Sequence, residues 1–199
     1  MTLTSARKGE MFSAARHKMA WLVRRGFAIF ALLATVSCAS QPSYRSAEVP
    51  LETVEAVDLD RYLGKWYEIA RFPNRFEKDC EGVTAEYARR QDGLITVTNT
   101  CRKNTPDGPE EVAKGRARIV NAETNAELKV SFFGPFWGDY WIIHLEEDYS
   151  VAIVSEPKGR YLWILSRTPT LPESQLKFLT EKIKADGFDT DALYFTRHN

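Results

Sequence analysis

Eight short segments with strand signals follow one another through the middle of this chain, tight turns separate them, and apolar and polar residues alternate in 83–88 and 94–99. Alternation with period two is typical of half-buried strands, and short turns join antiparallel neighbours. We therefore predict an all-β fold, an eight-stranded up-and-down antiparallel β-barrel, with a two-sheet sandwich as the alternative. The predicted strands lie at about 65–72, 82–90, 94–101, 112–120, 126–133, 138–146, 149–156 and 160–167.

A helix and one further strand are predicted after the eighth segment. The run from Thr170 to Glu173 resembles a capping box with proline in the first turn, and Gly187 is suited to end the helix. Residues 193–197 form the predicted ninth strand. The apolar residues expected on one face of the helix are Leu176, Leu179 and Ile183.

Two conspicuous blocks stand at the first and last predicted barrel strands. Gly64 precedes Trp66 by two residues, and Arg167 ends the eighth strand. These blocks resemble the signature of the lipocalin family, and the resemblance extends over residues 58–197 to the bacterial outer-membrane lipoprotein subgroup. It implies that Arg167 packs across Trp66 to seal one end of the barrel, a favourable cation–π contact, and that the helix lies outside. Further matching blocks are Lys129–Phe136, Asp148-Tyr149 and Tyr161–Thr170.

The N-terminal segment has the pattern of an export signal. Arg24 and Arg25 precede an apolar run at 26–36, which is shorter than the ~20 residues of a membrane span. We predict a signal peptide at 1–37. The run Thr35–Cys38 resembles a bacterial lipoprotein signal, which implies acylation of Cys38; the alternative is an ordinary signal peptide and a free thiol.

The resemblance to lipoprotein signals also implies a location. Ala39 after the cysteine fits sorting to the bacterial outer membrane, with the domain facing the periplasm. Residues 38–57 are then the lipid anchor and tether, and residues 58–197 are the lipocalin domain. Several acyl chains on one cysteine would hold the protein firmly at a membrane.

Charge argues against nucleic acid as a partner. The full chain has 27 basic and 27 acidic side chains, and cleavage after residue 37 removes six basic and one acidic group. The mature chain therefore carries a formal charge of −5. An acidic chain is not expected to bind nucleic acid or an anionic membrane surface through its net charge.

Cys80 and Cys101 remain as a pair in an exported chain. The turn signal Asp92-Gly93 folds two strands back on each other, which brings the two cysteines together at the open end of the hairpin. A disulfide is predicted, as in many lipocalins, with two free thiols as the alternative. No histidine stands at ligand spacing from either cysteine, so no metal site is expected.

Strand alternation predicts which side chains line the barrel. Residues on the same face as Trp66 and Arg167 should point inward, and the register of the family adds others. The resulting surface is mostly aromatic and aliphatic, although such side chains can also fill a small barrel completely. The predicted ligand-binding residues are Glu68, Ala70, Tyr140, Ile142, His144, Tyr149, Val151, Ile153, Tyr161, Trp163 and Leu165.

The resemblance implies a non-enzymatic protein that binds and stores or transports fatty acids or lysophospholipids, without a cofactor. One alternative is an envelope chaperone or structural lipoprotein. Another is a lipid-modifying enzyme, in which Glu68 and His144 would be the acid–base pair. Trp137, beside a Gly-Pro turn, has three open interpretations: it lines the mouth, contacts a membrane or joins a homodimer.

Overall fold

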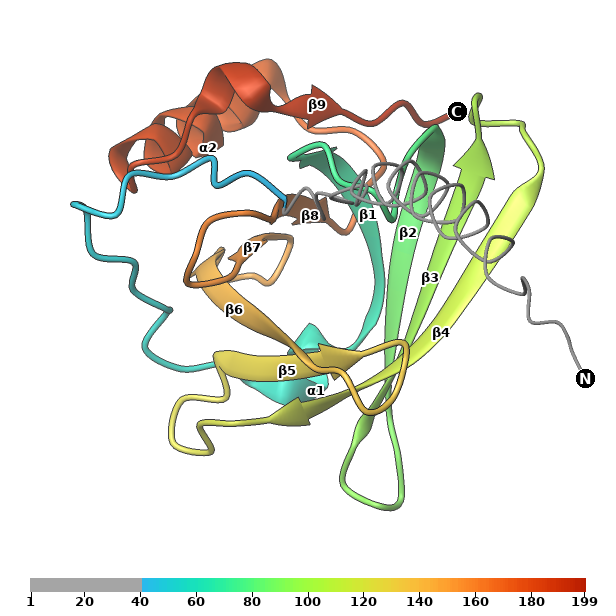
Figure 1. Ribbon diagram of the computed structural model, residues 1–199, viewed down its shortest axis with the longest axis vertical. Helices are drawn as coiled ribbons and strands as arrows, with labels where there is room; N and C mark the ends of the chain where they lie inside the picture. Colours follow the sequence, from blue (N-terminus) through green and yellow to red (C-terminus); the bar gives the residue numbers. More distant parts are fainter. Residues whose placement is uncertain (1–40) are drawn as a thin grey trace, which may run out of the picture. The chain divides into compact units, whose positions relative to one another are not determined.

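The computed structural model describes residues 41–199; Cys38 and the predicted signal peptide lie outside the described residues. Eight antiparallel strands follow one another round a barrel, which the pairing of β1 with β2 closes (Figure 1). The predicted barrel, helix and ninth strand are therefore confirmed. The elements are α1 (Leu59–Tyr62), β1 (Gly64–Arg71), β2 (Cys80–Arg89), β3 (Ile95–Lys103), β4 (Glu110–Ile119), β5 (Glu127–Ser131), β6 (Gly138–Leu145), β7 (Val151–Ser155), β8 (Leu162–Ser166), α2 (Glu173–Ala185), the 3-10 turn η1 (Thr190–Ala192) and β9 (Tyr194–Phe195).

The short helix α1 marks the closed end of the barrel. The Asp58 side chain accepts from the amides of Asp60 and Arg61 and so caps α1. The Arg61 guanidinium donates to the Glu147 carbonyl in the β6–β7 loop, at 2.8 Å. Because the strands alternate in direction, the loops at 72–79, 104–109, 132–137 and 156–161 lie at the opposite end, which we call the mouth.

Residues 41–57 run along the outside of the barrel from the mouth to the closed end. At the mouth, the Gln41 side chain donates to the Pro73 carbonyl, and the ring of Tyr44 stacks on that of Phe72 at 4.5 Å. At the other end, the Val57 amide donates to the carbonyl of Thr124 in the β4–β5 loop, at 2.7 Å. The segment that we expected to be a tether is thus packed against the barrel in its described part.

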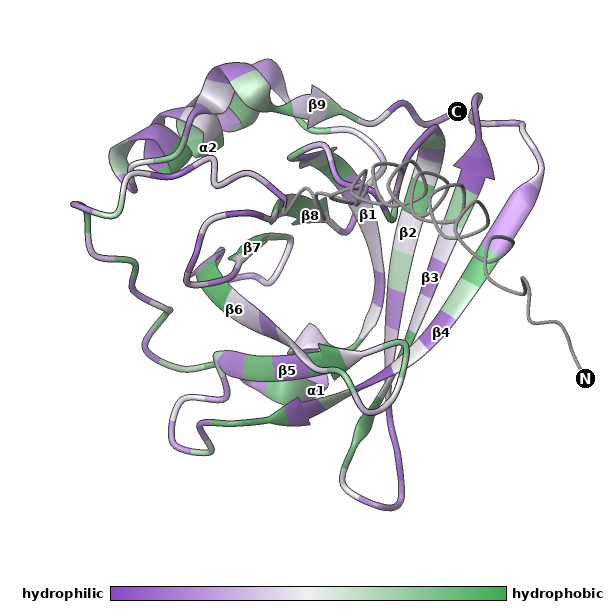
Figure 2. Cartoon of the chain, viewed as in Figure 1, coloured by the Kyte–Doolittle hydropathy of each residue, from purple (hydrophilic) through white to green (hydrophobic). Residues whose placement is uncertain are grey.

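Apolar residues form one cluster inside the barrel and a second cluster between the barrel and α2. Leu179 and Ile183 of α2 are fully buried in the outer cluster, as the helical spacing predicted. Along β2 and β3 apolar and polar residues alternate (Figure 2), whereas β7 and β8, which lie between the two clusters, are apolar on both faces. None of the helices between residues 41 and 199 is long and apolar enough to cross a membrane.

The predicted capping box of α2 is wrong. The helix begins at Glu173 with Pro172 at the N-cap position, where no side chain bonds to the first-turn amides. The Thr170 carbonyl instead accepts from the Thr168 hydroxyl, so the preceding residues form their own turn. The end of the helix is as expected, because Gly187 follows it with a φ of +87°, which suits glycine.

Candidate functional site

Arg167 and Trp66 seal the closed end. The guanidinium carbon of Arg167 lies 3.7 Å from the centre of the Trp66 ring, and Trp66 is fully buried. The same guanidinium donates to the carbonyls of Arg61 at 2.7 Å and Lys65 at 2.8 Å. Gly64 turns the chain between them with a φ of +92°, and a side chain there would be strained.

A disulfide joins Cys80 to Cys101 near the mouth, with their Cα atoms 5.3 Å apart. The predicted pairing is therefore confirmed, and the alternative of two free thiols is wrong. The bond joins the first residue of β2 to the last part of β3, where the strands are farthest from the Asp92-Gly93 turn. It holds the two strands together at the open end of their hairpin.

Most of the expected inner residues on β1, β6 and β8 do face the interior. Ile142 and Leu165 belong to the inner cluster, and Glu68 pairs with Leu165 on the same face. Trp163 packs against this cluster, and the ring of Tyr161 stacks on it at 5.9 Å, toward the mouth. The residues placed as expected are Glu68, Tyr140, Ile142, Tyr161, Trp163 and Leu165.

Four other expected orientations are wrong: bulges shift the alternation in β1 and β6, and the inward face of the regular strand β7 was assigned one residue off. The register slips between Glu68 and Ala70 in β1 and again between Ile142 and His144 in β6. Each slip reverses the face of the residues that follow. Ala70 and His144 follow these bulges and point outward, and the ring of His144 meets that of Phe178 of α2 at 6.1 Å. Val151 and Ile153 lie on β7, which pairs with β8 without a shift, and they belong to the cluster beneath α2 because Ala152 and Val154 are the inner residues of that strand.

Tyr149 is a component of the closed end and not of a ligand-binding wall. Its hydroxyl accepts from the Asp58 amide at 2.8 Å, and the Arg61 guanidinium lies over its ring at 4.0 Å. Its own φ is +62°, a left-handed conformation held by these contacts.

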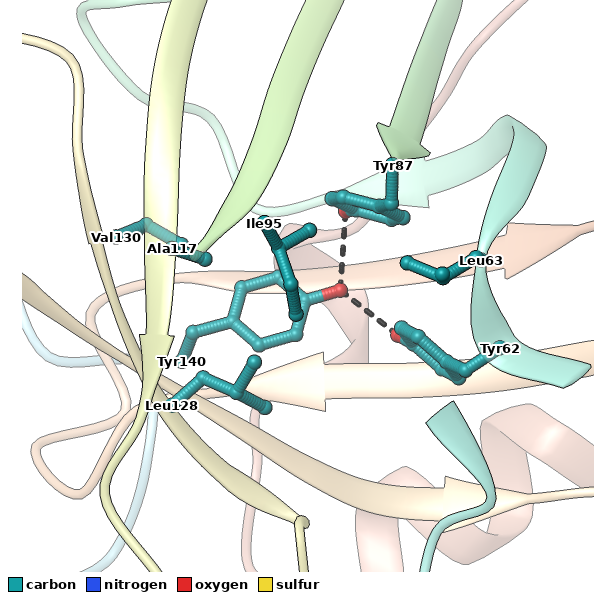
Figure 3. Close-up of a pocket in the computed structure, with 8 residues that line it drawn as sticks. All are labelled: Tyr62, Leu63, Tyr87, Ile95, Ala117, Leu128, Val130 and Tyr140. Carbon is teal, nitrogen blue, oxygen red and sulfur yellow. Dashed lines mark hydrogen bonds between the residues drawn. The ribbon is translucent and has the colours of Figure 1, made fainter. Parts of the chain in front are cut away.

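Three tyrosines, Tyr62, Tyr87 and Tyr140, meet inside the barrel just above the seal (Figure 3). The Tyr140 hydroxyl bonds to those of Tyr62 at 2.7 Å and Tyr87 at 3.0 Å. Burial raises the pKa of Tyr62 and Tyr140 well above the ordinary value and that of Tyr87 to about 12. A cavity of about 10 Å³ adjoins them, close to the size that one water molecule needs.

The remaining walls of this cavity are aliphatic. They are formed by Leu63, Ile95, Ala117, Leu128 and Val130 (Figure 3). Tyr62 and Tyr87 were not among the predicted inner residues, although the alternation of Tyr87 with Val83 and Ala85 was a usable signal.

A buried cluster of Glu68, Arg71 and Thr196 lies on the inner wall, nearer to the mouth than the three tyrosines. Arg71 donates to the Glu68 carboxylate at 2.5 Å, and the Thr196 hydroxyl also bonds to this oxygen. The guanidinium further donates to the carbonyls of Glu77 and Cys80, each at 3.0 Å. Because its donors are engaged, Arg71 clamps β1 to the C-terminal strand and the mouth loop and does not offer itself to a ligand.

Burial raises the pKa of Glu68 well above the ordinary range, and the neighbouring Glu77 adds to this effect against the opposing charge of Arg71. Nothing in the sequence pattern indicated this cluster, since an arginine at the end of a strand ordinarily faces solvent.

The inner wall of β3 and β4 is accessible near the mouth. Ala113 stands on the same face of β4 as the buried Ala117, opposite Asn99 of β3, yet Ala113 is exposed. The side-chain oxygen of Asn99 is buried and has no hydrogen-bond partner. The barrel is therefore packed at the closed end and open to solvent on this side of the upper wall.

The acid–base pair considered from the sequence is not formed. Glu68 faces the interior of the barrel, whereas His144 lies on the outside beside Phe178 and 3.3 Å from the Glu146 carboxylate. Proton transfer between two groups needs hydrogen-bond reach, directly or through one water. These two groups have the barrel wall between them.

Comparison with known proteins agrees with this architecture. The family model for a lipocalin-like domain matches residues 57–198. The outer membrane lipoprotein Blc of Vibrio cholerae is 42% identical over 174 residues, covering 85% of this chain and 98% of that protein. The Blc protein of Escherichia coli K12 is 44% identical over 155 residues, covering 77% and 84%.

A more distant relative and a solved structure extend the comparison. Temperature-induced lipocalin-1 of Arabidopsis thaliana is 38% identical, covering 73% of this chain and 82% of that protein. The structure of insecticyanin from the tobacco hornworm Manduca sexta has a TM-score of 0.62 at 21% identity, covering 79% and 88%, and so shares the fold. The closed barrel, the arginine over the tryptophan and these similarities lead to one conclusion: this chain belongs to the lipocalin family.

Proposed function

We propose that this protein is a lipid carrier of the bacterial outer membrane, held there by acyl chains on Cys38 and facing the periplasm. In this role it binds fatty acids or lysophospholipids in its barrel and stores or transports them without a cofactor. The relatives named outer membrane lipoproteins support the location. The observation that carries the binding role is an apolar inner wall that is open toward the mouth and sealed at the other end.

The chemistry of the inner wall favours an uncharged chain as the buried part of the ligand. The ionisable groups Glu68 and Arg71 inside the barrel are bound to each other and to neighbouring protein atoms. Burying an acyl chain contributes about 0.8 kcal/mol per methylene without any ion pair. The cavity beside the tyrosines is too small for such a chain, so we place the ligand between the tyrosine cluster and the mouth.

A pair of adjacent substitutions on β4 tests this placement. Ala113→Trp fills the upper inner wall, whereas Val112→Trp adds the same ring on the outer face, where Val112 is 47% exposed. Lysophosphatidylcholine and palmitic acid are the probes, and their binding is measured by calorimetry. Ala113→Trp should weaken binding by about tenfold, on the order of 1.4 kcal/mol, and Val112→Trp should leave it unchanged. Equal affinity in both variants would refute a ligand in the upper barrel.

A further inference from the structure

The mouth carries strongly exposed phenylalanines on two of its loops. Phe76, between β1 and β2, is 58% exposed, and Phe133 and Phe136, between β5 and β6, are 71% and 76% exposed. In the strand order, the β5–β6 loop lies four strands away from the β1–β2 loop, on the other side of the opening (Figure 1). Large apolar groups gathered on one end of a molecule mark an interaction surface.

Cationic groups accompany these aromatic side chains. The Arg75 guanidinium lies over the Phe76 ring at 4.9 Å, and that of Arg116 lies over the Trp137 ring at 5.3 Å. Guanidinium groups bind phosphate well, and aromatic residues favour the interface between headgroups and acyl chains. The combination fits a phospholipid surface. Nearby acids of β4 do not oppose it, because Glu110 and Glu111 are paired with Arg102 and Lys103 at 2.6 and 3.2 Å.

The path of the chain independently directs this end toward a membrane. Gln41 is held at the mouth by Pro73, and the Ser43 hydroxyl donates to the Lys158 carbonyl in another mouth loop at 2.7 Å. The three peptide units between Cys38 and Gln41 can span at most about 11 Å. Acyl chains on Cys38 therefore fix the mouth, and not the closed end, within that distance of the lipid.

We infer that the mouth of the barrel rests on the membrane, with Phe76, Phe133 and Phe136 inserted among the lipid headgroups. This inference goes beyond the proposed carrier role and rests on it only for the acylation of Cys38. Its consequence is a direct route for a lipid between the bilayer and the barrel, in which the acyl chain does not cross water.

Tryptophans placed at the two ends of the barrel test the orientation. The full chain is expressed with its N-terminal segment, purified from membranes and reconstituted in vesicles of phosphatidylcholine and phosphatidylglycerol with brominated acyl chains. Bromine quenches tryptophan fluorescence on close approach. Phe133→Trp and Phe136→Trp place the reporter at the mouth, and Val120→Trp places it on the closed-end loop, where Val120 is 53% exposed.

We expect bromine to quench the fluorescence added by either mouth substitution by about half or more. The fluorescence added by Val120→Trp should be unaffected, because strands of eight residues separate the two ends of the barrel by roughly 25 Å. Equal quenching at both ends, stronger quenching at Val120→Trp, or no quenching at any position would overturn the inference. Mass spectrometry of Cys38 in the same samples shows independently whether the anchor is present, so failure of the anchor and failure of the orientation give different results.

Discussion

Replacing Arg71 by methionine is expected to destabilise the protein strongly. The Arg71 side chain is almost completely buried and holds the Glu68 carboxylate, the Thr196 hydroxyl and two carbonyls. Its removal leaves these four buried acceptors without their donor. A buried acceptor left unsatisfied costs about 1–3 kcal/mol, so we expect a total loss of about 3–5 kcal/mol, which in a domain of this size lowers Tm by on the order of 10 °C.

The same cluster predicts that Glu68→Gln, unlike Arg71→Met, does not destabilise the protein at neutral pH. Glutamine keeps the side-chain oxygen that accepts from Arg71 and Thr196, and it resembles a protonated carboxyl group. Since the pKa of Glu68 is raised in the folded state, the folded protein binds a proton that the unfolded chain has already released. The free energy of unfolding should therefore fall as pH rises from about 4.3 through the raised pKa of Glu68. Glu68→Gln should remove this fall.

Urea unfolding of the two variants and the parent protein, followed by tryptophan fluorescence between pH 4 and 8, measures both effects. The double variant Glu68→Gln with Arg71→Met should recover part of the loss of Arg71→Met at neutral pH, because glutamine, unlike glutamate, does not have to bind a proton to be buried as a neutral group. The account of the cluster would be refuted if Glu68→Gln cost as much stability at pH 7 as Arg71→Met, or if it left the pH dependence unchanged.

Three further predictions concern the two ends of the barrel. Replacing Cys80 and Cys101 together by serine should lower the free energy of unfolding by about 3 kcal/mol, and urea midpoints under non-reducing conditions check this; a change below about 1 kcal/mol would contradict it. Arg167→Met should cost at least about 2 kcal/mol, because it removes the cation over Trp66 and donors to several carbonyls, and Arg167→Lys should recover less than half of this in the same assay. In an ultraviolet titration Tyr87 should remain protonated beyond pH 11, since its pKa is about 12; its ionisation near pH 10 in the folded protein would contradict the buried cluster.

The barrel could be predicted from sequence because its information is local. Strand alternation, the turn signals and the spacing of Leu179 and Ile183 each act over a few residues, and the structure agrees with them. The disulfide followed from the hairpin turn in the same way.

Orientation failed where a single extra residue broke the alternation. The residues at the two bulges are Ile69 and Ile143. Neither is a glycine or a proline, the residues that signal an interruption of a strand in the sequence. A bulge depends on how the strands twist round the closed barrel, which is a property of the whole sheet. The inward assignments of Ala70 and His144, which follow the bulges, were therefore reversed. Val151 and Ile153 were wrong for another reason: they lie on a regular strand whose inward face was assigned one residue off.

The buried groups were the least predictable part of the site. Arg71 and Thr196 are 125 positions apart in the sequence and meet only because β9 pairs with β1. The three tyrosines come from α1, β2 and β6, and each alone has the pattern of an ordinary apolar residue. Contacts of this kind join segments that only the closed barrel brings together, so a short sequence pattern does not predict them.

Native mass spectrometry of the protein purified from membranes tests the carrier proposal most directly. The account predicts a stoichiometric fatty acid or lysophospholipid, released on unfolding, and its loss or reduction in Ala113→Trp but not in Val112→Trp. An empty barrel that also takes up no added palmitic acid or lysophosphatidylcholine would contradict the account, and the function would then have to lie on the outer surface of the protein.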